Sequence, residues 1–268
     1  MRLHVGDVEV ASYVDDPYLD IRLGPRPYLH PVRTLGGVEV TETVPQDHPW
    51  HLGVSVAMQD VNGANLWGGR TYVRGQGYVW REDHGRIVHA GWTRQEESAF
   101  AERLHWQDGS GATLLTEDRT VTAAPAPGGW ELTFAYDLTA PADLDVVLGS
   151  PATNGRPDGA GYGGFFWRAA PGAARAFTAG RDGEADVNGS DEPWLAVTVD
   201  DTYTLVFRGL AGDDRWFVRT GEYPGVCAAL AYERPLAIAA GDTVRRRLAV
   251  LVADGALNPD RLREFGSA

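Results

Sequence analysis

Residues 129–140 read GWELTFAYDLTA, and apolar and polar side chains alternate along them. Successive side chains of an extended strand point to opposite faces, so Leu132, Phe134 and Tyr136 share one face. The alternation predicts a strand with one face buried and the other in water. Such strands are typical of antiparallel sheets.

The same two-residue period recurs on both sides of this segment. It appears at Val54, Val56 and Met58, in WLAVTVDDTYTLVFRG (194–209), and at Leu248, Val250 and Val252. Turn dipeptides such as Asn62-Gly63 and Asn188-Gly189 separate the segments, at intervals of roughly ten residues. This pattern predicts an all-β protein, folded as one large antiparallel β-sandwich domain over residues 1–268.

One helix signal occurs, near the C-terminus. Asn258 can cap a helix, and Pro259 suits its first position. Leu262 and Phe265 lie three residues apart, on the same helical face, before Gly266. We therefore expect one short C-terminal helix that packs on the sandwich.

The composition excludes several classes of chemistry. All 24 basic residues are arginine, so a lysine Schiff base and a phosphate-binding loop with its lysine are both excluded. Cys227 is the single cysteine, which rules out an intrachain disulfide and a cysteine-based zinc site. It lies in an apolar stretch, where a small buried side chain is the expected role.

Charge and hydropathy indicate a protein of the cytoplasm. The formal net charge of -13 repels nucleic acid and anionic membranes. Apolar runs are too short to cross a bilayer, and the N-terminus lacks the apolar run of a signal peptide. We expect neither nucleic acid nor membrane as a partner, and the sequence leaves open whether the chain forms a homo-oligomer.

Residues 27–86 hold most of the candidate site residues. Four of the seven histidines lie here, namely His30, His48, His51 and His84. Frequent glycine and proline predict turns and loops between short strands. Polar, aromatic and imidazole groups on such loops are typical of a site carried by a rigid scaffold.

His48 and His51, in the sequence Asp47-His48-Pro49-Trp50-His51, are the main candidates for catalysis. An offset of three places them on opposite faces of a strand but on the same side of a turn, and Pro45 and Pro49 favour a turn. A neutral imidazole can then act as a general base near pH 7. Alternatively, both histidines bond backbone carbonyls in a crowded loop.

The same two histidines are candidate ligands of a divalent metal. A third imidazole and a carboxylate would complete the set, from His30, His84, His89, Asp47 or Glu222. The chemistry otherwise requires no cofactor. An HxxH spacing alone is a weak metal signal.

Other polar and aromatic groups extend the candidate site. Arg33, beside His30, could polarise a carbonyl or form a structural ion pair. Amide, indole and phenol groups are what a sugar site uses to bind hydroxyls and C–H faces. The candidate substrate-binding residues are His30, Asp47, Asn65, Trp67, Tyr72, His84, Tyr162, Trp167, Arg168 and Arg219. Glu222 is a candidate general base, at the end of a strand before a turn.

Several motifs resemble one soluble bacterial family. They are RPYLHPVRTLGG (26–37), DHPWHLG (47–53), DVNGANLWGGRTYV (60–73), HGRIVHAGW (84–92), GYGGFFWR (161–168) and RTGEYPGVCAAL (219–230). They are similar to the PmoA-like family, also labelled methane oxygenase PmoA, from about residue 26 to 247. The family's function is uncertain, and its members often accompany sugar oxidoreductases and glycoside-processing enzymes.

The resemblance implies a fold and a set of site residues. The implied fold is a large antiparallel sandwich like that of the galactose mutarotases, whose sites pair histidines with a late glutamate. Glu222-Tyr223-Pro224 is similar to that late glutamate beside a Tyr-Pro turn. One departure concerns position 52. The family commonly has a second histidine directly after the one matched by His51, whereas this chain has Leu52, which weakens the metal hypothesis.

These observations favour a carbohydrate-active enzyme. The leading expectation is lyase or hydrolase chemistry on an oxidised (3-keto) glycoside. His48 or His51 would be the base, and Arg33 or a bound metal would polarise the developing oxyanion. The alternatives are a mutarotase- or epimerase-like enzyme, a non-catalytic carbohydrate-binding protein and, from the family label alone, a metal-dependent oxygenase.

Overall fold

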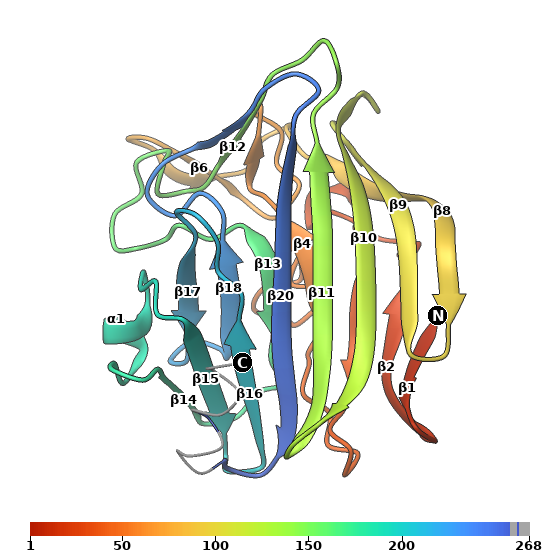
Figure 1. Cartoon of the computed structure of the whole chain (residues 1–268). Coiled ribbons are helices and arrows are strands. Elements are labelled where there is room, and N and C mark those ends of the chain that lie inside the picture. Colours follow the sequence, from red (N-terminus) through yellow and green to blue (C-terminus); the bar gives the residue numbers. More distant parts are fainter. Residues whose placement is uncertain (258–261, 263–268) are drawn as a thin grey trace.

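The computed structural model describes residues 1–257 and 262, and two large antiparallel sheets form its body (Figure 1). The seven-stranded sheet has the order β1 (Arg2–Val5), β2 (Val8–Val14), β3 (Tyr28–Val32), β4 (Val54–Ala57), β13 (Gly164–Arg168), β18 (Gly225–Ala229), β17 (Arg215–Arg219). The eight-stranded sheet has the order β14 (Ala174–Phe177), β15 (Trp194–Val199), β16 (Tyr203–Arg208), β20 (Thr243–Asp254), β11 (Gly129–Thr139), β10 (Thr113–Ala126), β9 (Ala99–Gln107), β8 (Arg86–Glu96). The predicted all-β antiparallel fold is confirmed.

Smaller elements complete the described chain. Three short strands form a third sheet, β19 (Leu236–Ile238), β12 (Val146–Gly149) and β5 (Asp60–Val61). A hairpin is made by β6 (Thr71–Val73) and β7 (Gly77–Val79). Within residues 1–257, helix is confined to the 3₁₀ turn η1 (Ile21–Leu23) and to α1 (Glu184–Val187). None of the described helices is long and apolar enough to cross a membrane.

Alternation along the strands builds the main core between the two large sheets. In β11, Leu132, Phe134 and Tyr136 are fully buried, as predicted. They belong to one cluster of buried hydrophobic side chains that draws on both sheets. That residues 1–268 form a single domain stays a prediction.

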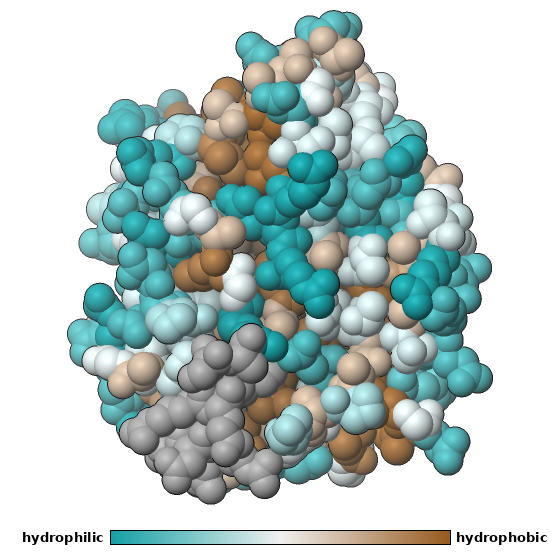
Figure 2. Space-filling model, in the orientation of Figure 1, coloured by the Kyte–Doolittle hydropathy of each residue, from teal (hydrophilic) through white to brown (hydrophobic). Residues whose placement is uncertain are grey.

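The outer face of the eight-stranded sheet is polar. Figure 2 shows mainly hydrophilic residues over this side of the molecule. Cross-strand ion pairs lie on it, with Arg245 Nε donating to Asp137 at 2.9 Å and Arg103 Nε to Asp118 at 2.8 Å. The next arginine, Arg246, points the other way and pairs with the buried Asp214 at 2.6 Å, as the two-residue period requires.

The middle of the seven-stranded sheet is buried on both faces. All residues of β4, β13 and β18 are buried. Phe165 and Trp167 face the main core, whereas Phe166 and Cys227 belong to a second cluster on the opposite face. Loops cover this second face, and the candidate site lies among them.

The predicted C-terminal helix falls on residues 258–266. Residues 258–261 and 263–268 lie outside the described residues. Of the predicted helix only Leu262 is described, and its side chain is buried against the cluster that contains Trp194.

Candidate functional site

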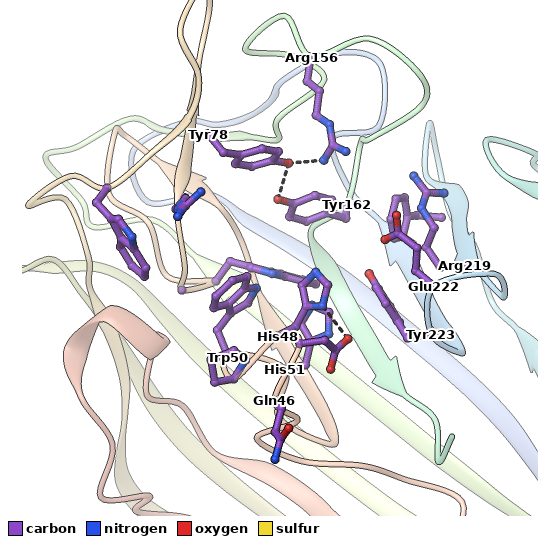
Figure 3. Close-up of a pocket in the computed structure, with 17 residues that line it drawn as sticks. Gln46, His48, Trp50, His51, Tyr78, Arg156, Tyr162, Arg219, Glu222 and Tyr223 are labelled. Atoms are coloured by element: carbon purple, nitrogen blue, oxygen red, sulfur yellow. Dashed lines mark hydrogen bonds and ion pairs between the residues drawn. The ribbon is translucent and has the colours of Figure 1, made fainter. Parts of the chain in front are cut away.

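A pocket of about 530 Å³ opens on the loop-covered face of the seven-stranded sheet (Figure 3). Four parts of the chain form it: the loop before β4, the segment from Trp67 to Trp80, the loop before β13, and β17 with its following turn. Its lining residues are Gln46, Asp47, His48, Pro49, Trp50, His51, Trp67, Gly68, Arg70, Tyr78, Trp80, Arg156, Tyr162, Phe217, Arg219, Glu222 and Tyr223.

The floor of the pocket is aromatic. Trp67 and Phe217 are almost wholly buried in the second cluster, together with Phe166. The ring of Trp67 packs on that of Tyr162 at 4.8 Å between centroids and on that of Phe166 at 4.9 Å. Aromatic faces of this kind suit the C–H faces of a sugar ring.

A tight turn brings His48 and His51 to the same side, as the prolines predicted. The His51 amide donates to the His48 carbonyl at 2.8 Å. The two imidazole rings stack with 4.7 Å between centroids and 10° between planes. Trp50 lies between them in the chain and packs against Gly69, where a Cβ would come within 2.6 Å of the indole. Position 69 must therefore be glycine for the Trp50 ring to pack here.

Asp47 holds the His48 ring in one orientation. His48 Nδ1 lies 2.8 Å from Asp47 Oδ2. Partial burial alone would raise the pKa of Asp47, but the hydrogen bond from His48 and the charge of Arg168 lower it overall. An ionised Asp47 can only accept, so Nδ1 of His48 carries the hydrogen and Nε2 keeps its lone pair. Nε2 has no hydrogen-bond partner among the described residues and is free to take a proton.

Arg168 lies beneath the pocket and contacts both His51 and Asp47, the partner of His48. Its Nη2 donates to both Asp47 oxygens at 3.2 Å, and its Nε donates to Glu42 at 2.9 Å. Its guanidinium carbon lies 4.3 Å from the centroid of the Tyr223 ring. The side chain is 4% exposed and does not line the pocket. Arg168 was predicted to bind substrate, but the structure makes it a residue that positions Asp47 and Tyr223.

His51 is held neutral. Arg168 Nη1 donates to His51 Nδ1 at 3.3 Å, and a guanidinium has no acceptor, so the ring hydrogen of neutral His51 lies on Nε2. Burial lowers the pKa of His51 well below its usual range, and the charges of His48, Arg168 and Arg26 lower it further. Since Nδ1 is occupied, His51 acts as a hydrogen-bond donor, and His48 is the better base of the two.

We expect acidification to destabilise the fold through His51. Its pKa in the folded state is below the unfolded value of 6.5, so the unfolded chain binds more protons below that pH. The free energy of unfolding should fall by up to about 1.4 kcal/mol per pH unit as the pH drops from 6.5 toward the folded pKa. Urea unfolding at about pH 7 and pH 5.5 measures this slope.

The matched variant is His51→Gln, which cannot titrate and should lose part of the slope. The pKa of His30 is also lowered by burial, so a residual slope remains. An identical pH dependence in wild type and His51→Gln would contradict the assignment.

A second wall is a chain of phenols that ends in a guanidinium. Arg156 Nη1 bonds the Tyr78 hydroxyl, which lies 2.9 Å from the Tyr162 hydroxyl, as the dashed lines in Figure 3 mark. Gln59 Nε2 donates to Tyr162 at 3.1 Å. Only one phenol donates within the Tyr78–Tyr162 bond, so the other keeps its O–H for a ligand. Burial raises the pKa of both phenols, which keeps them protonated.

The third wall comes from β17 and the turn after it. Arg219 stacks on Phe217 with 4.2 Å from its guanidinium carbon to the ring centroid, and its Nη1 lies 3.6 Å from Glu184 Oε1. Glu222 is exposed at the pocket rim and has no hydrogen-bond or ion-pair partner among the described residues. Figure 3 shows the Tyr223 hydroxyl directed into the pocket. Burial raises the pKa of Tyr223.

Comparison with known proteins places the chain in a family. The model of DUF6807, described as a family of unknown function, matches residues 1–265. The chain belongs to this family. No curated protein matches its sequence. Because the DUF6807 description names no activity, the resemblance to the PmoA-like family stays a prediction.

Solved structures resemble this DUF6807 protein only distantly. A candidate aldose 1-epimerase from Escherichia coli K12 has 11% identity and a TM-score of 0.47, over 94% of this chain and 98% of that one. An α-galactosidase from Lactobacillus brevis has 11% identity and a TM-score of 0.40, over 81% of this chain and 33% of that one. The heparan sulfate lyase HepC from Pedobacter heparinus, as a mutant, has 9% identity and a TM-score of 0.36, over 83% and 30%. This DUF6807 protein thus spans about a third of the last two, and at these values the likeness carries no argument about its activity.

Two predicted site residues lie outside the pocket: His30 in β3, and Arg33 directly after it. His30 Nδ1 lies 3.0 Å from the Thr41 hydroxyl, and Arg33 Nη2 lies 3.3 Å from Glu39 Oε2. Both side chains lie beside Glu39: its backbone pairs with that of Arg33, and its Oε1 lies 3.8 Å from His30 Nε2. Arg33 therefore does not reach the pocket to polarise a substrate, and it forms the structural ion pair that was the alternative.

Other predicted residues support the pocket instead of lining it. Asn65 is fully buried and holds the Trp67 and Gly68 amides through its Oδ1 at 3.0 and 2.9 Å. His84 is buried, with Nε2 2.6 Å from the Gly69 carbonyl. These contacts fix the loop that carries Trp67, and Trp67 lines the pocket. Tyr72 lines a separate pocket of about 380 Å³.

Trp167 is a core residue, contrary to its expected role in binding substrate. It is wholly buried against Phe207, and its Nε1 donates to the Val40 carbonyl at 3.0 Å. In β13, Trp167 shares a face with Phe165, whereas Phe166 faces the pocket side. Tyr162, three residues before Phe165, does line the pocket.

Part of the lining was not expected from the sequence. Arg70, Tyr78, Trp80 and Arg156 were not singled out, although all four line the pocket. Trp80 carried a usable signal, because it directly precedes three charged residues, Arg81-Glu82-Asp83, which favours a surface position, and it is 52% exposed. Arg156 carried none, since it stands in an irregular loop.

The predicted metal ligands do not converge. A metal bound by imidazole lies in the plane of the ring, and two rings stacked at 10° cannot both point in-plane lone pairs at one ion. Among residues 1–257 and 262, no group of three or more His, Cys, Asp or Glu residues could hold a metal ion. The described residues, as arranged, do not fit a metal ion. Elemental analysis of protein purified without a histidine tag tests the prediction.

Proposed function

We propose that this DUF6807 protein is an enzyme that moves protons on a sugar ring within this pocket. The observation that carries the proposal is the Asp47–His48 pair, in which a 2.8 Å hydrogen bond leaves Nε2 of His48 as a free base. Rings of His51, Trp50 and Tyr223 pack around the His48 ring at 4.7, 5.4 and 5.1 Å between centroids. A base held this firmly is preorganised for proton transfer.

An oxidised (3-keto) glycoside fits this chemistry best. A ring ketone acidifies the neighbouring C–H, so a neutral imidazole suffices to remove that proton. The electron pair then moves to the ketone oxygen, where a guanidinium of Arg156 or Arg219 can stabilise the enolate. In the next step the enolate restores the C3 ketone and its electron pair forms a double bond between C2 and C1, as the glycosidic C–O bond at C1 breaks. The leaving oxygen takes a proton from the Tyr223 hydroxyl, which burial keeps protonated. Arg156 and Arg219 thus take the role that was expected of Arg33.

The assignment is tested with matched sugars. Glycosides, their 3-keto forms and free aldoses are incubated with the protein, and proton NMR follows both binding and conversion. We expect conversion of 3-keto glycosides and none of the parent glycosides. Epimerisation of free aldoses would favour a mutarotase-like enzyme instead. Saturable binding with no conversion of any sugar would overturn catalysis and leave a carbohydrate-binding protein.

A further inference from the structure

The pocket holds positive charge that no carboxylate neutralises. Among residues 1–257, Arg70 and Arg156 form no ion pair, although most arginines of this acidic chain do. The two pack instead on the rings of Trp80 and Tyr78, with guanidinium carbons 5.9 and 4.8 Å from the ring centroids. Their charged groups line the pocket and are open to a ligand.

A third unpaired guanidinium lies beneath the floor. Arg26 is fully buried, and its nitrogens donate only to neutral oxygens, at 2.9–3.1 Å. These oxygens belong to Ser55, Gly24, Trp67 and Trp50, so the charge lies directly under two lining residues. Burial lowers the pKa of Arg26 to about 9, which still leaves it charged at neutral pH. A buried charge without a counter-charge is costly and favours an anion nearby.

The charges around the pocket come to one net positive charge. The arginines are Arg26, Arg70, Arg156, Arg168 and Arg219, and the carboxylates that line the pocket or pair with these arginines are Glu42, Asp47, Glu184 and Glu222. The whole chain carries -13. A pocket that is locally positive in an otherwise acidic protein attracts anionic ligands.

From this arrangement we infer that the sugar bound here carries a carboxylate, as a uronic acid does. The inference rests on the proposed sugar site and names its substrate class. One negative charge balances the pocket, and a planar carboxylate matches the fork of a guanidinium. Arg156 is the main partner, because its Nη1 is anchored on Tyr78 and its remaining N–H groups are unused by the described residues. Arg70, which packs on the ring of Trp80, adds a second positive charge to the lining.

The probes differ in one group only. Methyl β-glucuronide, methyl β-glucoside and methyl β-glucoside 6-phosphate share a ring and carry a carboxylate, a hydroxymethyl or a phosphate at the same carbon. The galacto-configured set is titrated in parallel, so that one ring hydroxyl does not decide the result. Isothermal titration calorimetry measures Kd for each.

We expect the uronide to bind at least about 10-fold more tightly than the neutral glycoside, because a charge-assisted hydrogen bond to arginine is stronger than a hydrogen bond between neutral groups. The preference should shrink as salt is raised from about 0.05 to 0.5 M. Arg156→Gln should abolish it and Arg156→Lys should keep part of it. The control Arg247→Gln removes an exposed, unpaired arginine on β20, away from the pocket, and should change nothing.

The failures are distinguishable. Equal binding of uronide and neutral glycoside overturns the carboxylate and leaves the proposed enzyme intact. Tighter binding of the phosphate shows that the anion is a phosphate group and overturns the uronic acid. A preference that survives in Arg156→Gln places the carboxylate elsewhere. Binding of no sugar in either configuration overturns both this inference and the proposed function.

Discussion

His48→Gln should lower kcat on a 3-keto glycoside by about 10²- to 10⁴-fold, with KM changed by only a few-fold. Glutamine fills a similar space but offers no basic nitrogen, so binding contacts persist while proton abstraction is lost. His48 contacts the pocket with a free Nε2, whereas its Nδ1 is committed to Asp47. Steady-state kinetics on wild type and variant measure the effect.

Asp47→Asn offers a graded comparison. An amide still bonds His48 but does not fix Nδ1–H, so a smaller loss of kcat is expected. His105→Gln is the matched control, because His105 lies on β9 of the other sheet and outside the pocket. A His48→Gln enzyme with full kcat would remove His48 from the chemistry and leave Glu222 as the base.

Arg119→Leu should cause the largest loss of stability, about 3–5 kcal/mol, because it leaves two buried carboxylates without their cation. Arg119 Nε donates to Glu117 at 2.7 Å, and its Nη1 lies 3.8 Å from Glu102. All three side chains are fully buried. Arg119 also donates to the Tyr13 hydroxyl at 2.8 Å, so the network ties β2 of one sheet to β10 of the other.

Urea unfolding at neutral pH measures this loss. Burial raises the pKa of Glu102, and the charge of Arg119 opposes that rise, so the variant should recover some stability as Glu102 takes up a proton on acidification. Arg103→Leu on β9 is the control: its pair with Asp118 is exposed, and we expect no measurable change. Equal stability of Arg119→Leu and wild type would contradict the role given to this network.

The strands were predictable because their signal is local. Two-residue alternation in residues 129–140 needs no distant partner to be recognised, and β11 follows it from Trp130 to Leu138. Which face of a strand packs against the core depends on distant parts of the chain and is not a local signal. In β13 the alternation already required Phe166 and Arg168 to share one face and Phe165 and Trp167 the other, so Trp167 and Arg168 could not both serve one site.

The site was predictable only where its residues cluster in the sequence. The loop from Asp47 to His51 stood out through its two histidines beside an aspartate, and the structure places both at the pocket. Tyr78 and Arg156 stand far apart in the chain. The sheet order β4–β13–β18 and the loops around it bring them together, and pairings over such distances leave no mark in the sequence. Arg33 failed for a different reason, since a nearby Glu39 satisfies it.

Hydrogen exchange at the carbon beside the ring ketone tests the central claim most directly. A 3-keto glycoside is incubated with the protein in D₂O and followed by proton NMR. Removal of the proton by His48 predicts loss of that C–H signal, through deuterium uptake or loss of the aglycone, well above the rate in buffer and absent in His48→Gln. If the folded wild-type protein binds the 3-keto glycoside yet leaves both the C–H signal and the aglycone unchanged, the proposed proton transfer is wrong.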